Sequence, residues 1–151
     1  MKNLTEYFNQ KNCPAVDNLS VAEVKKICIH IQTLINFAGK DILSLGCGDG
    51  RIEEILFSEV KPKNLTLLDI SERNLKMAQE KIPYAKLIQA DLRNSSLHEL
   101  ESYNLIYAAS VAQYFTSDEI QKLNLILFNH LKSNGNIFYF NVPDSRRRFL
   151  Y

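Results

Sequence analysis

The chain has 151 residues, which suffices for one domain with a single hydrophobic core. The chain has 18 Lys and Arg residues and 17 Asp and Glu residues, which gives a net charge of +1. This near-neutral charge argues against a nucleic-acid partner or a basic membrane-binding patch. No apolar run approaches the roughly 20 residues that a membrane-spanning helix needs, so we expect no membrane partner.

The three cysteines, Cys13, Cys28 and Cys47, are odd in number and widely spaced, and no C-x-x-C pair or His/Cys cluster accompanies them. This pattern favours neither a disulfide framework nor a zinc site. The N-terminal sequence MKNLTEYFNQ lacks the apolar core of a signal peptide. We therefore expect a cytoplasmic protein with reduced thiols and no metal ion.

Residues 1–39 are predicted to form an N-terminal helical cap, made of a short helix, a loop and a longer helix. The longer helix begins at Ser20, because Ser20 and Glu23 match the capping-box pattern. Apolar residues then recur at helical spacing, and Gly39 provides a C-terminal stop.

Strands and helices alternate between residues 40 and 141. Short apolar runs predict five strands, at residues 42–45, 65–68, 86–89, 104–108 and 136–141. Helical periodicity predicts helices at residues 51–57 and 72–81. A third helix is predicted to begin at a capping box at Thr116 and to reach Leu131, with Gly135 ending that region. We expect His130 on the surface. The alternation indicates an α/β fold, a three-layer αβα sandwich with a mainly parallel sheet, in a single domain spanning residues 1–151.

The first predicted strand runs directly into a glycine-rich loop, in the stretch DILSLGCGDGRI. Glycine lets the backbone turn sharply and lets a ligand approach closely, at the strand end where open parallel sheets bind ligands. The spacing G-x-G-x-G is one residue shorter than the dinucleotide fingerprint G-x-G-x-x-G, and no Gly-Lys-Ser/Thr follows, which excludes a P-loop.

Five stretches, in this order, resemble the motifs of the class I, Rossmann-like S-adenosylmethionine-dependent methyltransferases. The glycine loop LSLGCGDG is similar to that family's LDLGCGxG, and the acids of LTLLDIS and LIQADL follow the next two strands. The stretches YNLIYAAS and LKSNGNIFYF resemble the fourth-strand and fifth-strand motifs. The resemblance runs from about residue 40 to residue 141 and implies S-adenosylmethionine as cofactor, with S-adenosylhomocysteine as product.

The resemblance also implies roles for individual residues. Asp69 would bind the ribose hydroxyls and Asp91 the adenine amino group, with Ile70 and Leu92 on either side of the purine. The other expected cofactor contacts are Gly46, Cys47, Gly48 and, toward the methionine part, Ala109. The expected substrate contacts are Ser110, Gln113, Tyr114 and Phe115. Tyr7 and Phe8 are expected to fold over the same mouth as an N-terminal lid. No residue is named as a catalytic base.

Three departures from the family pattern leave alternatives open. Ser44 stands where the family usually has an acid, and Asn104 replaces an Asp for a reason that we expect to be structural. Residues 142–151 are too few for the sixth and seventh strands of the family sheet, so we expect a truncated C-terminal segment. A homodimer or another partner would then complete the sheet edge at residues 136–141.

The first functional hypothesis is therefore a methyltransferase that acts on a small molecule by direct in-line transfer. The second is a non-catalytic binding or scaffold domain of the same fold, which the replacement at Ser44 motivates. A nicotinamide-dependent oxidoreductase comes third, because the glycine spacing disfavours it.

Overall fold

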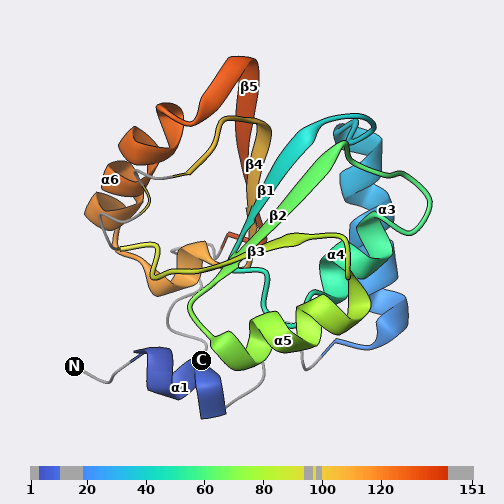
Figure 1. The fold of residues 1–151 in the computed structure, drawn as a ribbon, viewed down its shortest axis with the longest axis horizontal. Helices are drawn as coiled ribbons and strands as arrows, with labels where there is room; N and C mark the ends of the chain where they lie inside the picture. The colour runs from blue at the N-terminus through green and yellow to red at the C-terminus, as the bar shows by residue number, and fades with distance from the viewer. Residues whose placement is uncertain (1–3, 11–18, 94–96, 98–99, 143–151) are drawn as a thin grey trace.

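The computed structural model describes residues 4–10, 19–93, 97 and 100–142 (Figure 1). Within them, five strands form one sheet: β1 (Asp41–Leu45), β2 (Asn64–Asp69), β3 (Lys86–Gln89), β4 (Tyr103–Ala109) and β5 (Leu131–Phe140). The strand order is β3-β2-β1-β4-β5, and every neighbouring pair is parallel. The predicted α/β fold with a parallel sheet is confirmed.

Helices cover both faces of this sheet. They are α1 (Leu4–Gln10), α3 (Val21–Leu34), α4 (Arg51–Leu56), α5 (Glu72–Lys81) and α6 (Ser117–Phe128), with a short 3₁₀ helix, η2 (Ala112–Tyr114). Figure 1 shows α3, α4 and α5 on one side of the sheet and α6 on the other. None of the described helices combines the length and the apolar composition that a membrane span requires.

The central strand β1 is buried along its whole length, which explains its nearly continuous apolar sequence. Ile42 belongs to the core cluster beneath α3, α4 and α5, whereas its neighbour Leu43 belongs to the cluster beneath α6. Successive side chains of a strand point to opposite faces, so one strand supplies both cores.

Both predicted capping boxes are confirmed. The Ser20 side chain accepts a hydrogen bond from the backbone N–H of Glu23, and the Glu23 carboxylate accepts one from the backbone N–H of Ser20 at 2.8 Å. Thr116 and Glu119 make the same reciprocal pair at the start of α6. Each pair satisfies two of the N–H groups that a helix leaves unpaired at its N-terminus.

The boundary between the last helix and the last strand differs from the prediction. Helix α6 ends at Phe128, and β5 begins at Leu131 and runs through Gly135 rather than starting after it. The pairing of β4 with β5 is irregular here, and a Cβ on Gly135 would lie 2.9 Å from the carbonyl oxygen of Lys132. Gly135 thus allows a close backbone approach inside a strand and does not stop a helix.

His130 connects these two elements and is buried, so the prediction that it lies on the surface is wrong. Its backbone carbonyl accepts a 2.8 Å hydrogen bond from the N–H of Tyr103, and its own N–H donates to the carbonyl of Leu127. These bonds fix the turn from α6 into β5 against the start of β4.

The strand order reverses between β1 and β4, which are neighbours in space but not in sequence. The connections after β1 and after β4 therefore leave toward opposite sides of the sheet and open a crevice at the carboxyl ends of the strands. Leu45, Asp69 and Ala109 end β1, β2 and β4 at this edge. The crevice is where the fold favours a ligand site.

Candidate functional site

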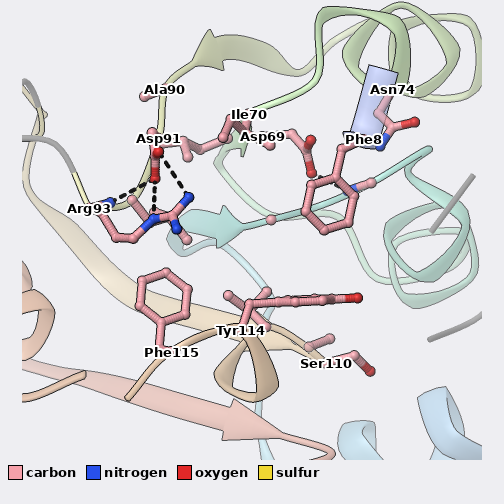
Figure 2. A pocket seen from close by; sticks show the side chains of 16 residues that line it. Phe8, Asp69, Ile70, Asn74, Ala90, Asp91, Arg93, Ser110, Tyr114 and Phe115 are labelled. Carbon is pink, nitrogen blue, oxygen red and sulfur yellow. Dashed lines mark hydrogen bonds and ion pairs between the residues drawn. The ribbon is translucent and has the colours of Figure 1, made fainter. Parts of the chain in front are cut away.

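A hollow of about 630 Å³, including the part open to solvent, lies at this edge of the sheet (Figure 2). Eleven residues predicted from the sequence line it: Phe8, Gly46, Gly48, Asp69, Ile70, Asp91, Leu92, Ala109, Ser110, Tyr114 and Phe115. Apart from Phe8 of α1, they lie at or after the ends of β1, β2, β3 and β4, so the fold brings together residues from position 46 to position 115.

Three further residues predicted for the site do not line the hollow. Cys47 packs against the core cluster shared by α3 and α4, and burial raises the pKa of its thiol well above the usual range. Gln113 is exposed and donates a 3.1 Å hydrogen bond to the carbonyl of Ser110. Tyr7 packs edge-on against Phe8, with 5.0 Å between ring centres, and Phe8 is the one that lines the hollow.

The glycine loop is tied to the end of β2. The backbone N–H groups of Gly46 and Cys47 both donate to the carbonyl of Leu68, at 2.7 Å and 3.1 Å. Gly46 has φ +63°, and a Cβ there would lie 2.6 Å from the Val111 side chain. Position 46 therefore requires glycine both for its backbone conformation and for space.

Asp69 is the central polar group of the hollow. Its carboxylate is 6% exposed and accepts 2.8 Å hydrogen bonds from the N–H of Gly48 and the N–H of Ser71. Burial raises the pKa of Asp69, against the lowering effect of hydrogen bonds with the Ser71, Gly48 and Ile70 backbone and with the Asn74 side chain. The residue also lines the hollow. Asp69 thus orders the entry to α5 and also faces the site.

One end of the hollow combines a charged pair with apolar surface. Nε and a terminal nitrogen of Arg93 each lie 3.0 Å from the Asp91 carboxylate, and the guanidinium lies 5.9 Å from the ring centre of Phe115. Figure 2 shows these three side chains on one side, away from Phe8. With Ile70 and Leu92 beside them, they suit a flat heteroaromatic ring that carries a hydrogen-bond donor.

Phe115 was expected among the substrate contacts and lines the hollow, whereas Arg93 was not named from the sequence. The only sequence signal for Arg93 is a basic residue two positions after an acid, in ADLR, which is common in loops. Phe115 lies just after η2 and reaches the site only because of how that turn packs.

The other end of the hollow is built around Ser110, which follows β4. Its backbone has φ +60°, and its N–H donates to the carbonyl of Phe140 at 3.0 Å. The amide of Asn141 donates to its Oγ at 2.7 Å. A non-glycine residue in this conformation costs energy and persists where several contacts hold it, as they do here.

Helix α1 spans the mouth of the hollow. The ring of Phe8 meets that of Tyr114 edge-on, with 5.2 Å between centres. At the other side, the Ser71 hydroxyl donates to the Asn9 side chain at 2.8 Å. Helix α1 therefore connects the start of α5 to η2, above Asp69.

Ser44 has an acidic partner from another element. Its Oγ lies 2.6 Å from Oε1 of Glu53, a buried residue of α4, and the Tyr107 hydroxyl lies 2.8 Å from the same oxygen. Burial raises the pKa of Glu53, while the two hydroxyls lower it.

The other departure from the family pattern is Asn104. Its side chain accepts a 3.0 Å hydrogen bond from the N–H of Asp41, which is the structural role that we expected.

The described residues fit S-adenosylmethionine. The Asp69 carboxyl group at the end of β2 suits a ribose, the apolar end with Asp91 suits adenine, and Gly46 places no side chain between the loop backbone and a ligand.

Comparisons with known proteins agree with this arrangement. Residues 42–135 match the family described as a methyltransferase domain. The chain is 30% identical over 110 residues to a trans-aconitate 2-methyltransferase of Paracidovorax citrulli, which covers 73% of this chain and 41% of that protein. A trans-aconitate 2-methyltransferase of Yersinia pseudotuberculosis is 33% identical over 75 residues, or 50% of this chain and 28% of that protein. The chain thus spans less than half of the length of these relatives.

Solved structures share the fold at low sequence identity. The DhpI–SAM–HEP complex superposes with a TM-score of 0.72 at 17% identity, covering 96% of this chain and 67% of that one. The N-methyltransferase NodS of Bradyrhizobium japonicum, solved with S-adenosylhomocysteine, also gives 0.72, at 18% identity, covering 91% and 72%. From the matched family, the fold and the pocket together, the chain belongs to the class I S-adenosylmethionine-dependent methyltransferases.

Proposed function

We propose that this chain binds S-adenosylmethionine in the hollow and directs transfer of its methyl group to a small-molecule acceptor. The observation that supports this most directly is the position of Asp69. It is a buried carboxylate at the end of β2, hydrogen-bonded to Gly48 of the glycine loop at 2.8 Å, and it lines the hollow. An acid in this position of an open parallel sheet binds ribose hydroxyls.

Other residues would hold the remaining parts of the cofactor. Asp91 would accept from the adenine amino group, between Ile70 and Leu92. The glycine loop and the end of β4 would border the methionine part through Gly46, Cys47, Gly48 and Ala109. The cofactor supplies an activated methyl group when bound, so the chain contributes mainly by fixing the acceptor in line with it.

The acceptor would enter beside Ser110 and Tyr114, beneath Phe8. Gln113 and Tyr7 would act indirectly, because Gln113 holds the Ser110 carbonyl and Tyr7 packs on Phe8. A general base is needed only where the acceptor must lose a proton during transfer. We assign none.

The acceptor class is open to direct test. The curated relatives are named trans-aconitate 2-methyltransferases, which makes carboxylic acids the first compounds to try. A cytoplasmic location, the absence of nucleic-acid and membrane partners, and pairing of the β5 edge with a second copy or another partner stay predictions.

The experiment is a mass-spectrometric methyl-transfer assay with S-adenosylmethionine and a panel of acids, amines and phenols that includes trans-aconitate. We expect Asp69→Asn to lower transfer about tenfold to hundredfold, because charge-assisted hydrogen bonds worth about 1.5–3 kcal/mol are lost. Asp118→Asn, an exposed acid at the start of α6, is the control and should leave the rate unchanged. Cofactor binding without transfer to any acceptor would favour the scaffold hypothesis.

A further inference from the structure

A buried carboxyl group lies beneath the glycine loop, and the proposed function gives it no role. Glu53 in the first turn of α4 is 1% exposed. Its Oε1 accepts from Ser44 and Tyr107, but its Oε2 has no hydrogen-bond partner among the described residues. An unpaired buried carboxylate oxygen is costly, so its retention calls for an explanation.

The titratable groups around Glu53 come from every element packed against it. They include Cys28 of α3, Cys47 and Asp49 of the glycine loop and Tyr107 of β4. Burial and the Glu53 charge raise the pKa of Cys28 to about 11. The charge of Asp49 disfavours a negative charge on Glu53, whereas the hydrogen bonds from Ser44 and Tyr107 favour one. Burial itself raises the pKa of Glu53, in the same sense as the Asp49 charge.

Glu53 is joined to the strands that form the floor of the hollow. Ser44 of β1 and Tyr107 of β4 are direct partners in the parallel ladder. Each stands two residues before a residue that lines the hollow, Gly46 and Ala109 respectively. Because Glu53 does not line the hollow, it can act on a ligand only through these strand ends and through its charge.

We propose that Glu53 is a positioning residue of the cofactor site, an inference that rests on the proposed function. Its carboxyl group holds the ends of β1 and β4 together beneath the glycine loop, and it gives up its proton when positively charged S-adenosylmethionine binds above it. The O–H bond of the carboxyl group breaks, the proton passes to the solvent, and the carboxylate then balances the charge that the cofactor brings. Opposite charges attract more strongly in a protein interior than in water, because screening is weaker there.

The test is calorimetric titration in slightly acidic buffers of different ionisation enthalpy, which reports the protons released on binding. The two ligands are S-adenosylmethionine and 5′-methylthioadenosine, which keeps the adenosine but has neither the sulfonium nor the amino-acid group. Asp69 would meet the ribose of both ligands, so its contribution cancels in the difference. We expect S-adenosylmethionine to release more protons than 5′-methylthioadenosine from the unmodified chain.

Glu53→Gln keeps the size of the side chain and an oxygen for the two hydroxyls. We expect it to abolish the difference in proton release, to weaken S-adenosylmethionine about tenfold and to leave 5′-methylthioadenosine within about twofold. Glu54→Gln, the exposed neighbour on α4, should change none of these values.

Equal proton release with both ligands from the unmodified chain would overturn the inference, and this holds even if Glu53→Gln does not fold. An equal loss of affinity for both ligands in Glu53→Gln would also overturn it, since that result indicates only a structural role. Failure of the folded, unmodified chain to bind S-adenosylmethionine would contradict the proposed function itself, and this inference with it.

Discussion

Lys81 on α5 holds the glycine loop through Asp49. Its Nζ lies 2.7 Å from the Asp49 carboxylate and 2.9 Å from the backbone carbonyl oxygen of the same residue. Burial alone would raise the pKa of Asp49, but the hydrogen bonds and charges of Lys81 and Arg51 together outweigh it, and the pKa is lowered. The loop is therefore fastened to β2 on one side and to α5 on the other.

Lys81→Met should loosen the loop. The variant removes a partly buried ion pair and a hydrogen bond to a carbonyl, so we expect a loss of about 1 kcal/mol in the free energy of unfolding. We also expect weaker binding of S-adenosylmethionine, measured by calorimetry. Lys76→Met removes an exposed ion pair with Glu72 on the same helix and should change neither quantity appreciably. Equal effects of the two variants would show that the Lys81–Asp49 contact does not order the site.

Gly50→Ala should be more harmful than Gly39→Ala. Both glycines have positive φ, +75° and +66°, so both variants force alanine into a left-handed conformation that costs about 1 kcal/mol. A Cβ at position 50 would also lie 3.0 Å from the Cα of Ala78, whereas position 39 has no atom within 4 Å. Urea denaturation should show Gly50→Ala less stable than Gly39→Ala by about 1–3 kcal/mol. Equal stabilities would mean that α5 does not pack against the loop as closely as the structure has it.

The buried carboxyl group of Glu53 should make the stability of the free chain depend on pH. Its pKa is raised in the folded state, chiefly by burial, so the folded chain keeps a proton that the unfolded chain loses near its ordinary value of 4.5. This contribution is complete below that value and declines as the pH rises through the folded pKa. Denaturation at a series of pH values above 4.5 should therefore show falling stability in the unmodified chain.

The same decline should be shallower in Glu53→Gln, which has no proton to lose. Burial also raises the pKa of Asp69, so this residue adds to the fall in stability with rising pH. Measuring Asp69→Asn in the same way separates the contribution of Asp69 from that of Glu53. An unchanged slope in Glu53→Gln would show that Glu53 is charged in the folded chain.

The positions of the ligand-facing acids could be predicted because parallel strands present their carboxyl ends at one edge. Once 65–68 and 86–89 were identified as strands, Asp69 and Asp91 had to lie near the glycine loop, and both do. Local patterns were enough for the first four strands, and capping boxes for the starts of α3 and α6.

The residues that could not be predicted depend on contacts between distant elements. Glu53 resembles an ordinary acid of a first helical turn until α4 is placed over Ser44 and Tyr107. Of the expected lid pair, only Phe8 lines the hollow, and the choice between it and Tyr7 depends on how α1 docks against α5 and η2. No periodicity encodes these contacts.

Gly135 was misinterpreted for a related reason. In sequence it resembles a helix stop, and only the pairing of β5 with β4 shows that it permits close approach within a strand.

The central claim is that the glycine loop and Asp69 form a binding site for S-adenosylmethionine. Its most direct test is calorimetric titration of the 151-residue chain with S-adenosylmethionine and S-adenosylhomocysteine, with NAD as the control ligand. We predict saturable binding of the first two and none of NAD. A folded chain that binds NAD, or that binds none of the three, would contradict the account.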